Sequence, residues 1–128
     1  MENNKDIEGL DYLQWSLFDS KDEVGSGYKF MERKPVLILD KYVKKTRYIL
    51  EIELAYVSPI EGNKNNLAMR DSHRVGHAVR LRMISPKKRM HLVAFLIKEG
   101  VRRIAFSKEY LYFDTDDLKE PMLNYWNY

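Results

Sequence analysis

Four segments of the chain have the hydrophobic pattern of β-strands. Residues 48–54 alternate strictly, with apolar side chains on one face and two glutamates on the other. Residues 76–84 alternate in the same way, with arginines opposite apolar side chains. Short apolar runs at 101–106 and 110–114 flank a turn and predict two further strands. Strict alternation is typical of strands with one buried and one exposed face, so we expect a sheet with one open side.

Two other segments have helical periodicity. The first covers residues 35–46 and begins at Pro35, a residue that suits a first helical turn. Its predicted buried stripe consists of Val36, Leu39 and Val43. The second helix follows Ser85 as N-cap and Pro86, and ends before Gly100. Its predicted buried stripe consists of Met90, Val93, Ala94 and Ile97.

The remaining segments are polar and predict connections. Residues 18–30 contain glycine, aspartate and serine and are typical of an ordered loop, and residues 57–72 predict a long polar loop. Residues 1–12 predict an N-terminal arm, and 13–128 a single domain. The order of helices and strands predicts an α+β fold, a small antiparallel sheet with packed helices.

Composition narrows the chemistry. The 128 residues include no cysteine, which excludes disulfides, thiolate metal sites and a cysteine nucleophile. No apolar run reaches the roughly 18 residues of a membrane helix, so we expect no membrane association. The start of the chain is polar and acidic and does not resemble a secretory signal, so we expect a cytoplasmic protein unless it belongs to a virion.

Charge is distributed unevenly along the chain. Residues 70–103 contain ten basic and two acidic residues, a net charge of +8. The rest of the chain contains 12 basic and 17 acidic residues, a net charge of −5. This polarity is compatible with a solvated face, with a surface that meets a partner in an assembly, or with a nucleic-acid surface. Nucleic acid is the least favoured of the three, because the segment lacks interleaved aromatic residues and a helix-turn-helix pattern.

The candidate interaction residues are the cations of this segment and two aromatic residues of the tail: Arg70, Arg74, Arg82, Lys87, Lys88, Arg89, Arg102, Arg103, Trp126 and Tyr128.

Five motifs follow one another along the chain. They are FDSKDEVGSG at 18–27, AYVSPIEGN at 55–63, SHRVGHAVRLR at 72–82, KEGVRRIAF at 98–106 and YLYFDTD at 110–116. In order and spacing they resemble the zinc D-Ala-D-Ala peptidases of bacteria and their phages, which share a fold with the hedgehog signalling domain. The resemblance extends from about residue 13 to the C-terminus and implies a hedgehog/DD-peptidase-like fold.

The resemblance also implies a degenerate active site. The family holds zinc with two histidines and one aspartate. The first histidine corresponds to His73, the aspartate to Arg80 and the second histidine to Tyr112. The carboxylate that serves as general base corresponds to Asp114, and the arginine that binds the substrate carboxylate corresponds to Val57. A guanidinium is always protonated and places a positive charge where the dication would lie, so we expect no metal, no cofactor and no catalysis.

Two details of this vestigial site stay open. Arg80 either forms a salt bridge with Asp114 in place of the metal or turns to solvent. A metal set made of His73 and His77, completed by Asp114 or Asp116, is the less favoured alternative to a retained fold histidine and a surface histidine.

The resemblance favours a non-catalytic peptidase-like domain that acts in binding or assembly. Related phage domains imply a virion component, such as an auxiliary capsid, neck or tail protein, with other proteins as partners in multiple copies. The alternatives are a zinc peptidase with a rearranged site that cleaves peptidoglycan, a module that only binds peptidoglycan, and an inhibitor of a host protein.

Overall fold

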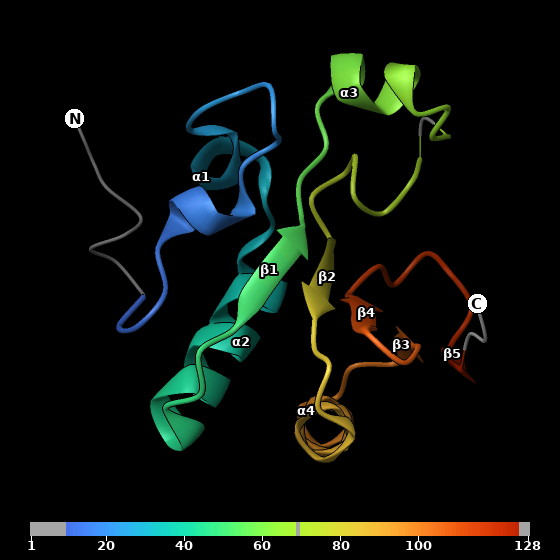
Figure 1. The fold of residues 1–128 in the computed structure, drawn as a ribbon. Helices are drawn as coiled ribbons and strands as arrows, with labels where there is room; N and C mark the ends of the chain where they lie inside the picture. Colours follow the sequence, from blue (N-terminus) through green and yellow to red (C-terminus); the bar gives the residue numbers. More distant parts are fainter. Residues whose placement is uncertain (1–9, 69, 126–128) are drawn as a thin grey trace.

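The computed structural model describes residues 10–68 and 70–125. Figure 1 shows helices packed around one sheet. In chain order the elements are η1 (Trp15–Phe18), α1 (Ser26–Phe30), α2 (Arg33–Thr46), β1 (Glu51–Leu54), α3 (Pro59–Lys64), β2 (Ala78–Arg82), α4 (Pro86–Lys98), β3 (Arg103–Phe106), β4 (Tyr110–Asp114) and β5 (Met122–Tyr125). The expected α+β class is confirmed.

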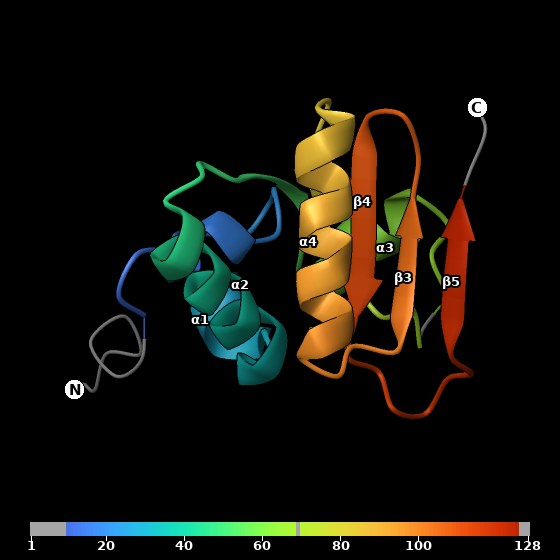
Figure 2. The same cartoon turned by 90° about the horizontal axis from the view of Figure 1, so that it is seen from below.

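The sheet has the strand order β1-β2-β4-β3-β5. The first four strands are antiparallel to their neighbours, as expected, but β5 runs parallel to β3, so the sheet is mixed. The prediction of an antiparallel sheet is therefore wrong for its last strand. The loop of residues 115–121 passes the N-terminal end of β3. Strand β5 therefore starts beside Arg103 and runs in the same direction as β3. Figure 2 shows β4, β3 and β5 side by side.

Helices α2 and α4 cover one face of the sheet (Figure 2). The opposite face, which these helices leave uncovered, is here called the open face. Helix α4 lies lengthwise along β4 on the covered face, with α2 beside it (Figure 2). Fully buried side chains of this face include Val79 and Leu81 on β2 and Leu111 and Phe113 on β4. Because strand side chains alternate, their neighbours Arg80 and Tyr112 point to the open face.

Helix α4 presents a different face to the core than the sequence predicts. Ser85 caps it as expected, accepting a hydrogen bond from the Lys88 N–H. Of the predicted stripe, Val93 is buried, whereas Met90 and Ile97 are about half exposed and Ala94 is exposed. The buried side chains of this helix are Arg89, Leu92, Val93, Phe95 and Leu96.

Arg89 fixes this rotation. Its buried Nη1 donates to the carbonyl oxygens of Met83 and Lys108, each at 2.8 Å. These bonds connect the first turn of α4 to the residue that follows β2 and to the turn between β3 and β4. The helix is apolar over most of its circumference between residues 90 and 97, so its periodicity alone does not choose a face.

The N-terminal segment is attached to α2 through Asp40. This buried carboxylate accepts the backbone N–H groups of Asp11, Tyr12 and Leu13, each at 2.9 Å. Residues 11 and 12 of the predicted arm are therefore bound to α2, and the boundary at residue 12 stays a prediction. Residues 1–9 lie outside the described part of the chain.

The two predicted loops contain short helices. Residues 18–30 include α1, and residues 57–72 include α3, whose N-cap Ser58 accepts a hydrogen bond from the Glu61 N–H at 3.1 Å. The prediction of a continuous polar loop at 57–72 is therefore wrong, although a serine followed by proline is a recognisable N-terminal signal. No helix within the described residues is long and apolar enough to cross a membrane.

Two glycines with similar backbone conformations provide a test of packing. Gly76 (φ +78°) and Gly100 (φ +89°) both adopt the left-handed region, but a Cβ at Gly76 would overlap the Phe30 carbonyl oxygen, whereas at Gly100 it would meet nothing within 4 Å. Gly100→Ala should cost about 1–2 kcal/mol, the conformational penalty alone. Gly76→Ala should cost about 1–3 kcal/mol more because the backbone must move. Urea unfolding measures both, and equal losses would contradict the close approach.

Candidate functional site

The structure brings together the four positions singled out by the resemblance. Strands β2 and β4 pair Arg80 with Tyr112 and Ala78 with Asp114, so these side chains share the open face. The His73 ring lies beside Tyr112, with 5.5 Å between ring centroids. His73, Arg80, Tyr112 and Asp114 therefore form one cluster, here called the central cluster.

His73 is held in a defined tautomer. It is buried, and its Nδ1 lies 2.7 Å from the carbonyl oxygen of Ala55. A carbonyl only accepts hydrogen bonds, so Nδ1 carries the proton and Nε2 has the lone pair in the neutral ring. Burial lowers the pKa of His73 below its ordinary value. The imidazole is therefore neutral near pH 7.

The carboxylate of Asp114 is saturated by donors. Arg103 Nε lies 2.9 Å from both oxygens, the Tyr112 hydroxyl donates to one at 2.5 Å, and the Asp116 N–H donates to the other at 3.0 Å. Burial and the neighbouring carboxylate raise the pKa of Tyr112 far above its usual value, so its hydroxyl stays protonated and donates. Asp114 is fully buried, and these donors compensate its lost hydration.

Arg80 binds a carboxylate that the sequence analysis does not assign to the site. Its Nε donates to Glu53 Oε1 on β1 at 2.5 Å, and its guanidinium lies 5.4 Å from the centroid of the Tyr110 ring. The expected salt bridge between Arg80 and Asp114 is wrong, and so is the alternative of an arginine turned to solvent. Asp114 is taken by Arg103, its direct register partner on β3.

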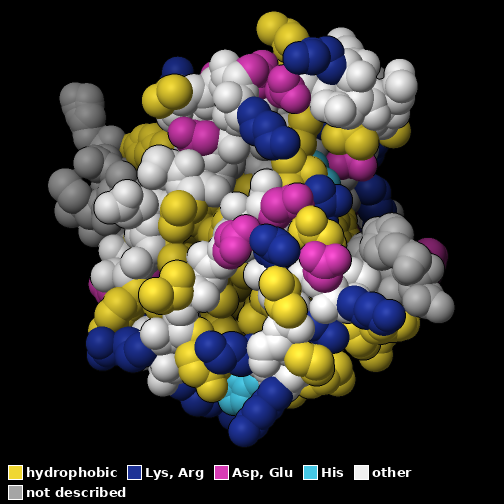
Figure 3. Space-filling model, viewed as in Figure 1, with side chains coloured by type: hydrophobic (Ala, Val, Ile, Leu, Met, Phe, Trp, Pro, Cys, Tyr) yellow, Lys and Arg dark blue, Asp and Glu magenta, His cyan; other side chains and the backbone are white. Residues whose placement is uncertain are grey.

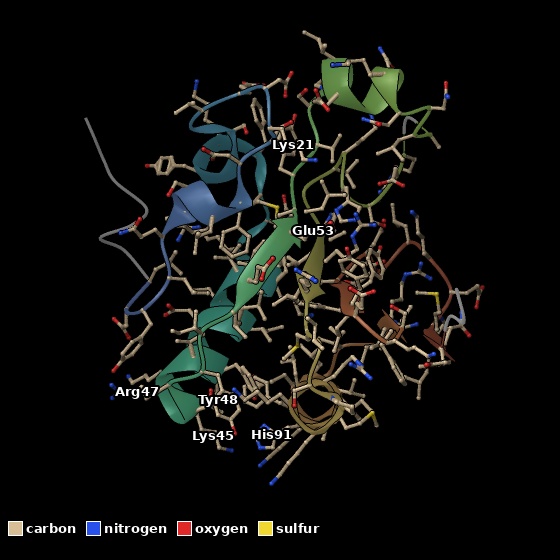
Figure 4. All side chains as sticks on the ribbon, viewed as in Figure 1. Lys21, Lys45, Arg47, Tyr48, Glu53 and His91 are labelled. Carbon is tan, nitrogen blue, oxygen red and sulfur yellow. The ribbon has the colours of Figure 1, made fainter. Side chains whose placement is uncertain are left out.

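Two hollows flank Arg80. The first hollow has a volume of about 230 Å³. It is lined by residues that come before and after β1 in the chain, including Lys21, Tyr56 and Glu61. The other, of about 290 Å³, lies over the β3–β4 turn and includes Lys108 and Tyr110. Lys21 and Glu53 lie on the same side of the molecule in Figure 4. Both hollows are lined by a tyrosine ring and by acidic and basic side chains.

Asp116 is occupied in the same way as Asp114. Arg70 donates to both of its oxygens, at 2.8 and 3.0 Å, and the Ser72 hydroxyl donates at 3.0 Å. Burial opposes ionisation, but these hydrogen bonds outweigh it and lower the pKa of Asp116. Within the described residues, no group of three or more histidine and carboxylate side chains is arranged to hold a metal ion.

The cations of the basic segment do not form one surface. Arg89 is buried, and Arg70 and Arg103 are engaged by buried carboxylates, so these three are not available as a free interaction surface. Arg74 donates to Asn63 and to the Leu67 carbonyl oxygen. The remaining candidates, which are exposed, are Arg82, Lys87, Lys88 and Arg102. Trp126 and Tyr128 lie outside the described residues.

Comparison with known proteins gives no match to a family model, to a curated protein or to a solved structure. The geometry of the central cluster is therefore the basis for a functional proposal.

Sequence reasoning missed two partners of the cluster, Glu53 and Arg103. The hairpin turns at residues 108 and 109, because the Ser107 N–H donates to the Tyr110 carbonyl oxygen at 2.9 Å, and this register places Arg103 opposite Asp114. The turn expected at residues 107–109 would place Arg103 opposite residue 113 instead, so a shift of one residue hides the pair. The pairing of Glu53 with Arg80 had no signal in the sequence, because β1 and β2 are joined by a long connection that contains a helix.

The carboxylates of Asp114 and Glu53 should differ strongly in their contribution to stability. Asp114→Asn should lower the free energy of unfolding by about 3–5 kcal/mol, because it leaves the largely buried Arg103 without its counter-ion. Glu53→Gln should lower it by about 1 kcal/mol or less, because the Arg80 and Glu53 side chains are 38% and 33% exposed. Chemical denaturation measures both, and a larger loss for Glu53→Gln would contradict the assignment.

Burial of neutral His73 predicts a dependence of stability on pH. Since the folded-state pKa lies below the ordinary value of 6.5, the unfolded chain takes up the proton first as the pH falls. The free energy of unfolding should therefore fall below about pH 6.5, by up to about 1.4 kcal/mol per pH unit. Urea unfolding between pH 7.5 and 5.5 should show this slope in the wild type and in His91→Gln but not in His73→Gln. The same slope in all three proteins would assign it to other groups.

Proposed function

We propose that this chain is a non-catalytic, peptidase-like module that binds other proteins in an assembly. The observation that carries the proposal is the occupation of the central cluster by internal ion pairs. Arg103 and Tyr112 take up Asp114, and Glu53 takes up Arg80.

The chemistry of these contacts supports a binding role. A carboxylate that activates water needs a free oxygen within hydrogen-bond reach of that water. Both oxygens of Asp114 already accept bonds from charged or protonated donors. Burial is the main cause of the lowered pKa of His73, and the permanent positive charge of Arg80 lowers this pKa further. These contacts stabilise the sheet and compete with a bound cation.

The finer fold assignment is part of this proposal. We infer a hedgehog/DD-peptidase-like domain because positions 73, 80 and 112, which the family uses for its zinc ligands, converge on the open face. Direct antiparallel partners have Cβ atoms about 4.5–5.5 Å apart, which is close enough for Arg80 and Tyr112 to replace two ligands of one ion.

We place the binding surface over the two hollows that flank Arg80. They combine the Tyr56 and Tyr110 rings with Lys21 and Glu61. Such a surface suits a segment of another protein that carries apolar and charged side chains. Figure 3 shows acidic and basic side chains next to one another in the middle of the viewed face. In the narrower form of the proposal, the assembly is a phage particle in which the module is an auxiliary capsid, neck or tail protein present in many copies.

Zinc binding by a restored ligand set tests the proposal. The double variant Arg80→Asp with Tyr112→His supplies an aspartate and a histidine beside His73. In calorimetric titration it should bind zinc with about 1:1 stoichiometry at micromolar concentration. The wild type should bind none at that concentration, because Arg80 places a cation at the site.

A matched control uses the next register pair on the same strands. Arg82 faces Tyr110 in the sheet, so Arg82→Asp with Tyr110→His makes the same chemical change without a nearby His73. This control should not bind zinc. Stoichiometric zinc in the wild type would overturn the proposal in favour of a rearranged zinc peptidase, and release of peptides from peptidoglycan fragments would then identify the activity. No binding by the restored variant would overturn the inferred peptidase-like fold.

A further inference from the structure

A group of basic and aromatic side chains lies away from the central cluster, where the end of α2 approaches one side of α4. It consists of Lys45, Arg47, Tyr48, Lys88, His91 and Lys98 and is here called the helix-end patch. Figure 4 shows Lys45, Arg47, Tyr48 and His91 gathered at the lower end of the molecule. In Figure 3 the same end carries Lys and Arg side chains around a histidine ring.

Helical spacing on α4 forms one half of the patch. Lys88, His91, Phe95 and Lys98 follow one another at intervals of three, four and three residues and therefore line one side of the helix. Lys45 near the end of α2 completes this side, with its Nζ 5.9 Å from the centroid of the Phe95 ring. The patch thus joins two segments that are far apart in the sequence.

Cations and aromatic rings alternate across the patch. Lys88 Nζ lies 4.7 Å from the centroid of the Tyr48 ring, and Arg47 Cζ lies 4.7 Å from that of Tyr12. The basic segment 70–103 lacks this interleaving in the linear sequence. It arises in the structure because Tyr12, Arg47 and Tyr48 come from outside that segment.

Most of the charge of the patch is uncompensated. Two neighbouring lysines are engaged, since Lys41 pairs with Glu99 at 2.8 Å and Lys44 with Asp11 at 3.6 Å. Within the described part of the chain, no ion pair involves the four cations of the patch: Lys45, Arg47, Lys88 and Lys98. Repulsion among such cations is relieved when an anion binds.

A hollow of about 180 Å³ lies inside the patch, lined by Lys45, His91, Ala94, Phe95 and Lys98. The buried Tyr42 hydroxyl lies 2.8 Å from His91 Nδ1, and burial raises the pKa of Tyr42 to about 12, so the phenol keeps its proton. This contact occupies Nδ1 and leaves Nε2 of the ring for a ligand. Two ammonium groups and an imidazole therefore border one hollow.

We propose that the helix-end patch binds the phosphate backbone of a single-stranded nucleic acid. One phosphate occupies the hollow between Lys45, His91 and Lys98, and its neighbours along the strand contact Lys88 and Arg47. Lysine, arginine and N–H donors are the groups that bind phosphate oxygens. The partly exposed Tyr12 and Tyr48 rings beside these cations favour a nucleic acid over an acidic protein segment, because bases alternate with phosphates along a strand and stack on aromatic side chains.

Binding of a labelled single-stranded DNA 20-mer tests this inference. Fluorescence anisotropy at 50 mM salt should show binding by the wild type and an affinity at least about tenfold lower for Lys45→Gln with Lys98→Gln. The slope of log affinity against log salt concentration should also become smaller by about 0.7, since both lysines border the same phosphate and each phosphate contact on a single strand contributes about 0.7.

The matched control removes one charge from α1 and one from the other end of α2. Lys29→Gln with Lys34→Gln changes the net charge equally, and Lys34 lies roughly 16 Å along the helix from Lys45. This control should lose no more than about twofold in affinity. Thermal melting followed by circular dichroism should show that both double variants are folded.

Three results would overturn the inference. The first is no binding of the 20-mer by folded wild-type protein at 50 mM salt. The second is an equal loss of affinity in the two double variants, which would indicate only general charge attraction. The third is binding of polyglutamate or of phosphatidylserine vesicles as tight as that of DNA, which would assign the patch to an acidic protein or to a membrane surface.

Discussion

The buried carboxylate of Asp114 is the constraint on which the open face of the sheet depends. A charge without water must be paired and fully hydrogen-bonded, and the donors must come from the strands that surround it. Arg103 from β3, Tyr112 from β4 itself and the Asp116 N–H from the following loop meet this requirement. Arg103 also donates to the Glu120 carbonyl oxygen just before β5. One ion pair therefore connects the β3–β4 hairpin to the start of the edge strand.

This arrangement determines what the rest of the central cluster does. With Asp114 satisfied by Arg103, Arg80 takes the partly exposed Glu53, and its guanidinium lies over Tyr110 between two hollows. His73 stays neutral because its burial disfavours the charged ring more than the Ala55 carbonyl oxygen favours it. In the proposed function, these contacts stabilise this face as a surface for binding.

The two proposed surfaces use different physical terms. Around Arg80, charges of both signs lie beside aromatic walls, so recognition there depends on shape and on local pairing. In the helix-end patch, cations of one sign lie together without acidic partners, so attraction there depends on salt. The surfaces share no residue, and each is supported by its own contacts.

The sequence by itself determined the two longer helices and four of the strands. Alternation indicated β1 and β2, short apolar runs indicated β3 and β4, and Ser85 and Pro86 marked the start of α4. The tertiary structure decided which face of α4 is buried, through the three carbonyl contacts of Arg89, and the parallel direction of β5. It also decided that Arg80 binds Glu53 and that Lys45 and Arg47 join the cations of α4. The physical reason is that periodicity records the environment along one segment, whereas the partner of a charge depends on distances set when separate segments pack together.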